Sequence, residues 1–165
     1  MTGISLLEVT EIIEGLAANG IKVWVDGGWC VDALVGKELR DHHDLDIAVS
    51  RADEAALRAW FAAGGYDPRP SNHESAWNFV LGLQDRVVDV HVFEFDEHGT
   101  HIYGVEYPAA SLTGHASLGG LDVRCIAPEW MFRFKTAYDP APKDIRDVRA
   151  LAEKFGFVVP VSHLQ

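Results

Sequence analysis

Two aspartates, Asp44 and Asp46, stand at the start of the apolar segment 45–49. Because successive side chains of a strand point to opposite faces, a strand here places both carboxylates on one face, about 6–7 Å apart at Cα. Two negative charges this close are unfavourable unless a cation or a proton lies between them. Mg²⁺ prefers carboxylate oxygens and leaves positions for water and phosphate ligands, so the pair predicts a magnesium site.

A third carboxylate occurs in a similar setting. The alternating segment 86–95 places Asp89 and His91 on one face of a predicted strand and valines on the other. If this strand neighbours the first, Asp89 joins Asp44 and Asp46 in a cluster that can hold two metal ions roughly 3.5–4 Å apart for in-line phosphoryl displacement. We therefore expect the three aspartates to bind metal and to carry the catalysis. His91 is either a partner in proton transfer or a structural histidine.

A pair of glycines, Gly27 and Gly28, follows a predicted strand over 21–25 and precedes a helix predicted over 29–35. Glycines between a strand and a helix let backbone N–H groups approach an anion, and the helix dipole favours its charge. A glycine pair is by itself typical of a plain turn, and an isolated Asp-x-Asp is typical of a solvated strand edge. Their combination, with Asp44 following Gly28 by 16 positions, predicts a phosphate site. Its candidate contacts are Gly27, Gly28, Arg40 and Lys143.

The elements that position these residues follow from hydrophobic periodicity. Further helices are predicted over 6–18, 52–63, 128–138 and 143–155, and further strands over 45–49, 77–83, 86–95 and 121–126. Residues 96–120 are expected to form loops with a short strand near Ile102 and Tyr103. This order predicts an α+β fold with a mixed β-sheet and flanking helices. We expect one domain over 1–165, with a catalytic sheet core at about 5–126 and a short C-terminal helical part at about 127–157.

Composition limits the classes of partner. The chain has 165 residues, 48% of them hydrophobic, and its 14 Lys+Arg against 25 Asp+Glu give a net charge of −11. This charge argues against a nucleic acid polymer as partner and favours an amine-bearing small molecule. The acidic N-terminal segment and the short apolar runs predict a cytoplasmic protein that binds no membrane. Cys30 and Cys125 are expected to be reduced and buried.

The motifs 25–34 and 40–47, with the later segments 127–131 and 138–147, resemble nucleotidyltransferases of the DNA polymerase β superfamily. The resemblance covers about residues 5–157 and is closest to the small antibiotic-modifying members, the lincosamide and the aminoglycoside 2″-nucleotidyltransferases. It implies a nucleotidyltransferase (DNA polymerase β-like) fold. It also implies transfer of a nucleoside monophosphate from an NTP, commonly ATP, to a hydroxyl of an antibiotic, with release of pyrophosphate.

The resemblance also implies residue roles. Asp44 and Asp46 match the metal-binding pair, and Asp89 matches the third carboxylate, which is a metal ligand or the general base. Gly27, Gly28 and Arg40 match positions that hold the triphosphate. Because the long C-terminal helical domain of larger relatives is absent, acceptor binding shared between two subunits of a homodimer is an open possibility.

Two readings from other classes remain open. One is a metal-dependent hydrolase that uses His42, His43 and Asp44, although neighbouring histidines on a strand or loop point apart. The other is a module that binds a nucleotide or a drug without turnover. Three clustered carboxylates argue against pure binding, because binding alone does not need so repulsive a cluster. The sequence leaves the acceptor, the preferred NTP and the oligomeric state open.

Overall fold

A mixed β-sheet runs through the centre of the protein, as a computed structural model that describes residues 3–164 shows. Its strands are β1 (Val23–Asp26), β2 (Leu45–Ser50), β3 (Asp67–Arg69), β4 (Asn78–Leu83), β5 (Arg86–Phe95), β6 (His101–Gly104), β7 (Gly114–Leu118) and β8 (Leu121–Cys125). They lie in the order β3-β4-β5-β2-β1-β8-β7, with β6 paired to β5. The pairs β2–β5 and β1–β8 are parallel and the others antiparallel, which confirms the predicted mixed sheet.

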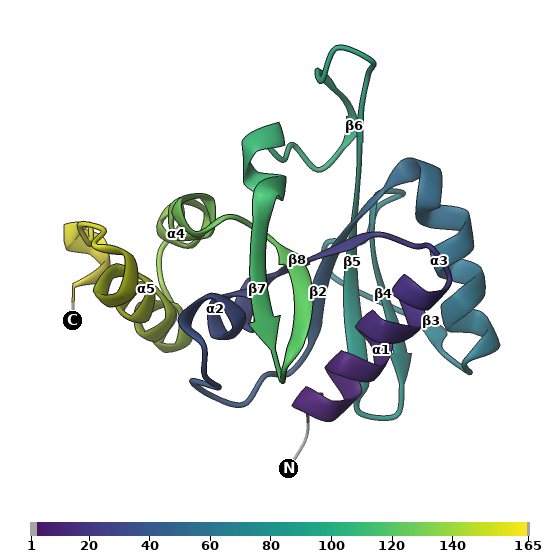
Figure 1. Ribbon diagram of the computed structural model, residues 1–165, viewed down its shortest axis with the longest axis horizontal. Helices are drawn as coiled ribbons and strands as arrows, with labels where there is room; N and C mark the ends of the chain where they lie inside the picture. Colours follow the sequence, from purple (N-terminus) through teal and green to yellow (C-terminus); the bar gives the residue numbers. More distant parts are fainter. Residues whose placement is uncertain (1–2, 165) are drawn as a thin grey trace.

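Helices cover both faces of this sheet. They are α1 (Leu6–Ala18), α2 (Gly27–Val35), α3 (Arg51–Ala63), α4 (Pro128–Thr136) and α5 (Pro142–Phe155), with short 3₁₀ turns at Ala109–Thr113 and Val161–His163. Figure 1 shows α1 and α3 on one side of the sheet and α2, α4 and α5 on the other. The described part of the chain is therefore an α+β fold, as predicted.

Alternation along β2 and β5 separates an apolar face from a polar one. Leu45, Ile47, Val88 and Val90 are completely buried. Asp46 and Asp89, which occupy the intervening positions, face the other side because side chains alternate along a strand. Burial of the apolar set holds the register, since a slip by one residue would bring the aspartates into the core.

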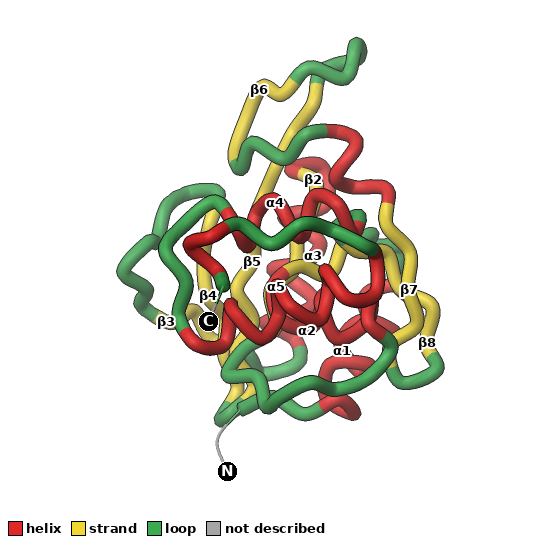
Figure 2. Tube along the Cα trace, turned by 90° about the vertical axis from the view of Figure 1, so that its left-hand side faces the viewer, coloured by secondary structure: helices red, strands yellow, loops and turns green. Residues whose placement is uncertain are grey.

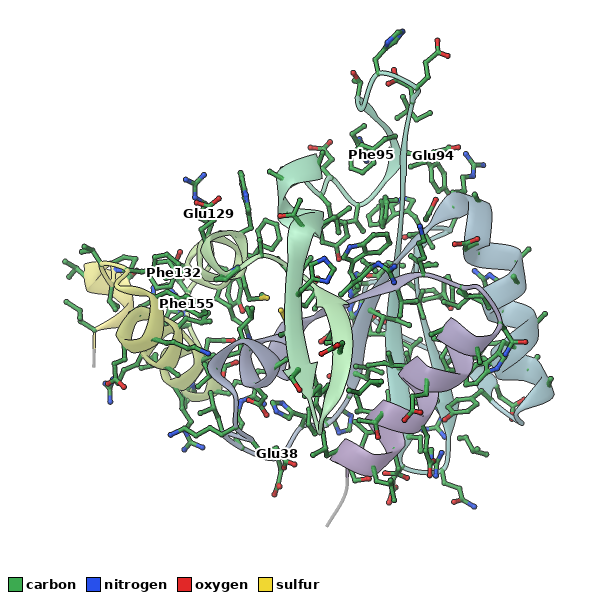
Figure 3. The ribbon with its side chains drawn as sticks, viewed as in Figure 1. Glu38, Glu94, Phe95, Glu129, Phe132 and Phe155 are labelled. Atoms are coloured by element: carbon green, nitrogen blue, oxygen red, sulfur yellow. The ribbon has the colours of Figure 1, made fainter. Side chains whose placement is uncertain are left out.

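Local signals explain the ends of the helices. The Ser5 N–H donates to Glu8 Oε1 (2.9 Å), and the Glu8 N–H donates to Ser5 Oγ (3.2 Å), which forms a capping box at the start of α1. The segment that follows α5 packs on both C-terminal helices through Phe157: its ring centroid lies 4.8 Å from that of Phe132 in α4, and its ring stacks on Phe155 at the end of α5. Figure 3 shows Phe132 and Phe155 between α4 and α5.

The structure differs from the sequence prediction in three elements. Helix α2 begins at Gly27 rather than at residue 29, because the Asp26 side chain caps it by accepting from the Gly27 N–H (2.7 Å). Strand β7 forms inside the predicted loop 96–120: its Gly, His and Ser residues have low strand propensity, but pairing with β8 orders it. The short edge strand β3 was also not predicted.

Other expectations are confirmed. The strands expected over 77–83 and 86–95 are β4 and β5, and because Leu83 pairs with Arg86, Gln84 and Asp85 form a two-residue hairpin turn between them, with Gln84 at φ 54°. The short strand expected near Ile102 is β6, and Figure 2 shows the β5–β6 hairpin projecting from the body of the protein. Cys30 and Cys125 are buried and free. Among the described residues, no helix combines the length and apolar character needed to cross a membrane.

Candidate active site

The parallel pairing of β2 with β5 places Asp46 directly opposite Asp89. His91 lies beside both, with its Nε2 3.4 Å from Asp46 Oδ1 and 3.7 Å from Asp89 Oδ1. One ligand atom from each of these three residues lies within 4.8 Å of the others, a spacing that suits a metal ion. Strands β2 and β5 are therefore neighbours, as expected. We call Asp46, Asp89 and His91 the compact group.

Asp44 lies at the edge of this compact group rather than within it. Partial burial, followed by the charges of Asp46 and Asp89, raises the pKa of Asp44 to about 6, while His43 and Lys143 act in the opposite direction. The three aspartates predicted from the sequence are thus close enough to repel one another. Such repulsion is the electrostatic condition for binding a cation.

His91 supplies part of the compensating charge in the absence of a cation. Burial acts to lower the pKa of His91, but a hydrogen bond to Asp46 and the charges of Asp89 and Asp46 raise it to about 9. At neutral pH the imidazole is therefore protonated: its Nε2–H donates to Asp46, and its charge forms an ion pair with Asp89. This contact with two acidic side chains gives His91 an electrostatic part in the site.

Asp26 is a further acidic residue of the site, which the sequence analysis did not assign. It pairs with Asp46 across β1 and β2, and its Oδ2 accepts a hydrogen bond from the Tyr107 hydroxyl (2.7 Å). Burial and then the charge of Asp46 raise the pKa of Asp26. Its position directly before the glycine pair was the available signal. No local sequence pattern pointed to its partner Tyr107, because Tyr107 lies 81 positions further along the chain.

The two glycines are required by close approach. Gly27 has φ +60°, and a Cβ there would overlap the Asp46 carboxylate oxygen Oδ2. A Cβ on Gly28 would lie 2.5 Å from His42 Nδ1 and 2.6 Å from an Arg40 guanidinium nitrogen. The glycine pair therefore lets the N-terminus of α2 approach the carboxylates, and its role in phosphate binding stays a prediction.

Asp89 is held by two residues that the sequence analysis did not identify. The Asn78 side-chain amide donates to Asp89 Oδ1 (2.6 Å) and also lies 3.2 Å from the Val90 carbonyl oxygen. His73 Nε2 lies 3.0 Å from Asp89 Oδ2. Asp89 itself is only 6% exposed. Each oxygen of this carboxylate thus has its own nitrogen partner.

Arg40, predicted to contact phosphate, is bound to a carboxylate. Its Nε and Nη2 donate to the two oxygens of Asp147 in α5, at 3.2 and 2.9 Å. The same Asp147 forms an ion pair with Lys135 (3.0 Å), and Lys135 pairs with Asp144 (3.2 Å). This buried network joins the segment before β2 to the C-terminal helices. Much of the positive charge of Arg40 is therefore balanced within the protein.

A cavity of about 950 Å³ opens beside the carboxylates. One part of its lining is the start of α2, residues 40–44, Asp46 and His91. The other part is the segment 105–107 together with residues of α4, of the α4–α5 connection and of the first turn of α5, which contains Lys143. Lys143 is exposed, and no other residue within 3–164 forms an ion pair with it. The predicted Gly27, Gly28, Arg40, Asp44 and Asp46 thus share one cavity with Lys143, while Asp89 is not one of its lining residues but contacts His91, which is.

The structure contradicts the alternative metal centre built on His42, His43 and Asp44. His42 is buried and its Nε2 lies 2.6 Å from Asp32 Oδ2, while its ring packs on Trp29 with centroids 4.4 Å apart. His42 thus has a structural role, because its hydrogen bond to Asp32 and its packing on Trp29 hold the loop before β2. Among the described residues, the compact metal-type group is formed by other side chains.

Comparison with known protein families places these features in context. The chain matches the sequence profile described as aminoglycoside-2″-adenylyltransferase over residues 8–151. A 2″-aminoglycoside nucleotidyltransferase from Klebsiella pneumoniae is 24% identical over 121 residues, 72% of this chain and 67% of that protein. A lincosamide resistance protein from Staphylococcus haemolyticus is 56% identical over 40 residues, which are 24% of this chain and only 25% of that relative's length.

Solved structures show the same architecture. The structure of ANT(2″)-Ia in complex with adenylyl-2″-tobramycin has a TM-score of 0.77 at 21% identity and covers 92% of this chain and 89% of that one. A lincosamide antibiotic adenylyltransferase with lincomycin bound has a TM-score of 0.76 at 22% identity and covers 90% of this chain and 97% of that one. At these identities the likeness shows a shared nucleotidyltransferase fold.

Proposed function

The chain belongs to the aminoglycoside-2″-adenylyltransferase family, and on this basis we propose the reaction that it catalyses. The protein transfers a nucleoside monophosphate, AMP from ATP, to a hydroxyl of a small antibiotic such as a lincosamide or an aminoglycoside, and releases pyrophosphate. One observation carries the proposal: the Asp46–Asp89 pair lies beside a cavity of about 950 Å³ that also holds Asp44, the start of α2 and Lys143.

The residues present fit Mg²⁺ as the cofactor. Asp46 and Asp89 offer carboxylate oxygens within 4.8 Å of each other, and the pKa of Asp44 is raised first by burial and then by the negative charges of these two residues. Carboxylate oxygens are the ligands that Mg²⁺ prefers. We propose that Asp44, Asp46 and Asp89 hold two Mg²⁺ ions. Bound Mg²⁺ supplies charge neutralisation for a triphosphate and polarises its phosphoryl oxygens.

The rest of the cavity suits the triphosphate. Gly27 and Gly28 line the cavity at the N-terminus of α2, where the missing side chains leave room for a phosphate near the Gly28 N–H, while the Gly27 N–H donates to Asp26 Oδ1. Lys143 is the cavity cation that no other described residue pairs, so its charge is available to a phosphate. Arg40 also lines the cavity, but its bidentate contact with Asp147 makes it a weaker partner. We therefore assign Lys143 the larger share of phosphate binding.

The acceptor site is assigned to the side of the cavity formed by the segment 105–107 and helix α4. Met131, Phe134 and Tyr107 provide an apolar wall, and the Tyr107 and Phe134 ring centroids lie 6.2 Å apart. Glu106 is exposed on the same wall and offers a carboxylate to an amine of the acceptor. An amphipathic, amine-bearing antibiotic matches this combination of an apolar surface and an acidic group.

The transfer step follows from these positions. The acceptor hydroxyl oxygen forms a bond to the α-phosphorus, and the bond from that phosphorus to the α–β bridging oxygen breaks. Pyrophosphate leaves with the electron pair, and the hydroxyl proton passes to Asp89. The two hydrogen bonds that Asp89 accepts leave further lone pairs for this proton. The protein accelerates this reaction by positioning the groups and by neutralising charge.

Mass spectrometry tests the proposal directly. The purified protein is incubated with Mg²⁺, each of the four NTPs, and a panel of lincosamides and aminoglycosides. We expect an acceptor heavier by one nucleoside monophosphate, stoichiometric pyrophosphate, and neither product with Asp46→Asn. Binding of NTP and drug without pyrophosphate in every pair would instead identify a binding module. Full turnover by Asp46→Asn would contradict the metal role of Asp46.

A further inference from the structure

We propose that His73 is a positioning residue for the transfer reaction and that it acts by fixing the carboxylate of Asp89. This inference rests on the proposed function, in which Asp89 is catalytic. His73 Nε2 lies 3.0 Å from Asp89 Oδ2, and the Asn78 amide donates to Oδ1 at 2.6 Å. A carboxylate oxygen accepts in such a contact, so the hydrogen of this bond lies on His73 Nε2.

Two donors on different oxygens fix the rotation of the carboxylate. A single hydrogen bond would leave Asp89 free to turn about its Cβ–Cγ bond, whereas contacts at both oxygens define the plane of the group. In that orientation Oδ1 lies 3.7 Å from His91 Nε2, which in turn lies 3.4 Å from Asp46 Oδ1. The carboxylate is therefore held on the side that faces its partner aspartate.

The loop between β3 and β4 is shaped to deliver His73 to this position. The His73 N–H donates to Ser71 Oγ (3.2 Å), which turns the chain just before the histidine. Ser75 forms an isolated bridge with Asn78, so the loop returns directly to the start of β4. Asn78 and His73 thus reach Asp89 from one continuous segment, Asn78 from the strand and His73 from the loop.

Asn78 and His73, which both contact Asp89, differ in solvent exposure and therefore in their expected contribution to stability. Asn78 is 6% exposed and also bonds to the Val90 carbonyl oxygen, so it contributes to the core as well as to Asp89. The His73 side chain is 58% exposed. Because most of the His73 side chain is in contact with solvent, its truncation leaves no buried cavity and should change the free energy of unfolding little. The contact of His73 with Asp89 therefore serves orientation more than folding, and a variant at His73 will fold.

Loss of His73 will reduce the fraction of molecules with a productive Asp89. Residues that orient metal ligands or reacting carboxylates typically contribute about 10–100-fold to activity or metal affinity. We expect His73→Ala to lower kcat by about tenfold or more, with weaker metal binding and little change in KM for the acceptor. Substrate-contacting groups such as Lys143 and Glu106 are unaffected by the change.

The experiment compares His73→Ala and His73→Gln with the control His98→Ala. His98 is a still more exposed histidine in the β5–β6 turn, where it contacts the exposed Glu97. We measure kcat and KM for transfer, Tm, and Mn²⁺ binding by electron paramagnetic resonance without substrates. His73→Gln keeps an N–H donor, so it should recover part of both kcat and Mn²⁺ affinity, whereas His98→Ala should match the wild type.

The outcomes separate this inference from the proposed function. If the wild type transfers no nucleotide, the proposed function fails first. If the wild type is active and His73→Ala matches His98→Ala in kcat and Mn²⁺ binding, the positioning role is overturned.

A second test uses the Asp89→Asn background, in which His73→Ala should cause no further loss of residual transfer. A loss as large as that in the wild-type background would show that His73 acts without Asp89.

Discussion

Asp46 and Asp89 are register partners on the neighbouring parallel strands β2 and β5, with His91 in contact with both. This pairing places two carboxylates at the same level of the sheet and on the same face. On the opposite face of the two strands, Leu45, Ile47, Val88 and Val90 are fully buried, and their packing holds the strands together. A packed core thus maintains a repulsive arrangement that a bound cation would relieve.

Mg²⁺ should stabilise the folded protein through this pair. A ligand that binds only the folded state at 100 times its Kd adds about 2.7 kcal/mol to the free energy of unfolding. We expect Mg²⁺ to raise Tm in the wild type and EDTA to reverse the shift. Asp46→Asn removes one carboxylate oxygen from the compact group, so its Tm should respond much less. An equal shift in both proteins would place the bound metal elsewhere.

Asp44 should make the metal-free protein less stable as the pH rises. Its pKa in the folded protein is about 6 against an ordinary value of 3.8, so the folded state binds more protons between these values. The contribution of protonated Asp44 to stability is complete below about pH 3.8 and is lost as the pH rises through about 6. Asp44→Asn should therefore stabilise the metal-free protein at pH 8.

Urea unfolding in EDTA at several pH values measures this effect. The stabilisation by Asp44→Asn should shrink steadily as the pH falls from 6 towards 3.8, because the wild-type carboxyl then becomes neutral as well. A stabilisation that stays constant over this range would mean that Asp44 is not repelled by its neighbours. Asp53, an acidic residue in the first turn of α3, provides a control through Asp53→Asn.

Gly27→Ala should abolish transfer while Gly36→Ala preserves it. Both glycines have positive φ, at +60° and +92°, so both alanine variants carry backbone strain. Only at Gly27 would the new Cβ overlap Asp46, whereas nothing lies within 4 Å of a Cβ at Gly36. Comparing kcat at matched Tm separates displacement of Asp46 from general strain. Equal activity of the two variants would contradict the close-approach explanation.

Asp147→Ala should be among the most destabilising single substitutions of a polar residue. It leaves Arg40 and Lys135 without their shared carboxylate in a place where Asp147 is fully buried. Breaking a buried ion pair by removing one partner costs about 3–5 kcal/mol in the free energy of unfolding. Urea denaturation measures the loss. As a control, Glu54→Ala removes the surface pair with Arg58 and should cost only about 0.3–0.5 kcal/mol.

Tyr107→Phe tests the hydrogen bond that supports Asp26. The Tyr107 hydroxyl donates to Asp26 Oδ2, and Phe would leave that oxygen without this donor next to the charge of Asp46. Leaving a buried acceptor unsatisfied costs about 1–3 kcal/mol. We expect a lower free energy of unfolding at neutral pH. Since protonation of Asp26 relieves the penalty, the difference from the wild type should narrow at acidic pH.

The sequence by itself determined the local features of this protein. The alternation around Asp44 and Asp46, the glycine pair and the capping box of α1 each depend on residues within a few positions, so periodicity and spacing revealed them. The same signals predicted the helices and most strands. Strand β7 was not predicted, because its residues have low strand propensity and only its pairing with β8 orders it.

Only the tertiary structure decided which side chains meet at the site. Strand pairing brought Asp89 to Asp46 and placed His91, rather than Asp44, in the compact group. Packing of α5 gave Arg40 its partner Asp147, and a loop delivered His73 to Asp89. These contacts join segments far apart in the chain. Local periodicity determines the face of an element on which a residue lies. Strand order and helix packing determine which other residues contact that face.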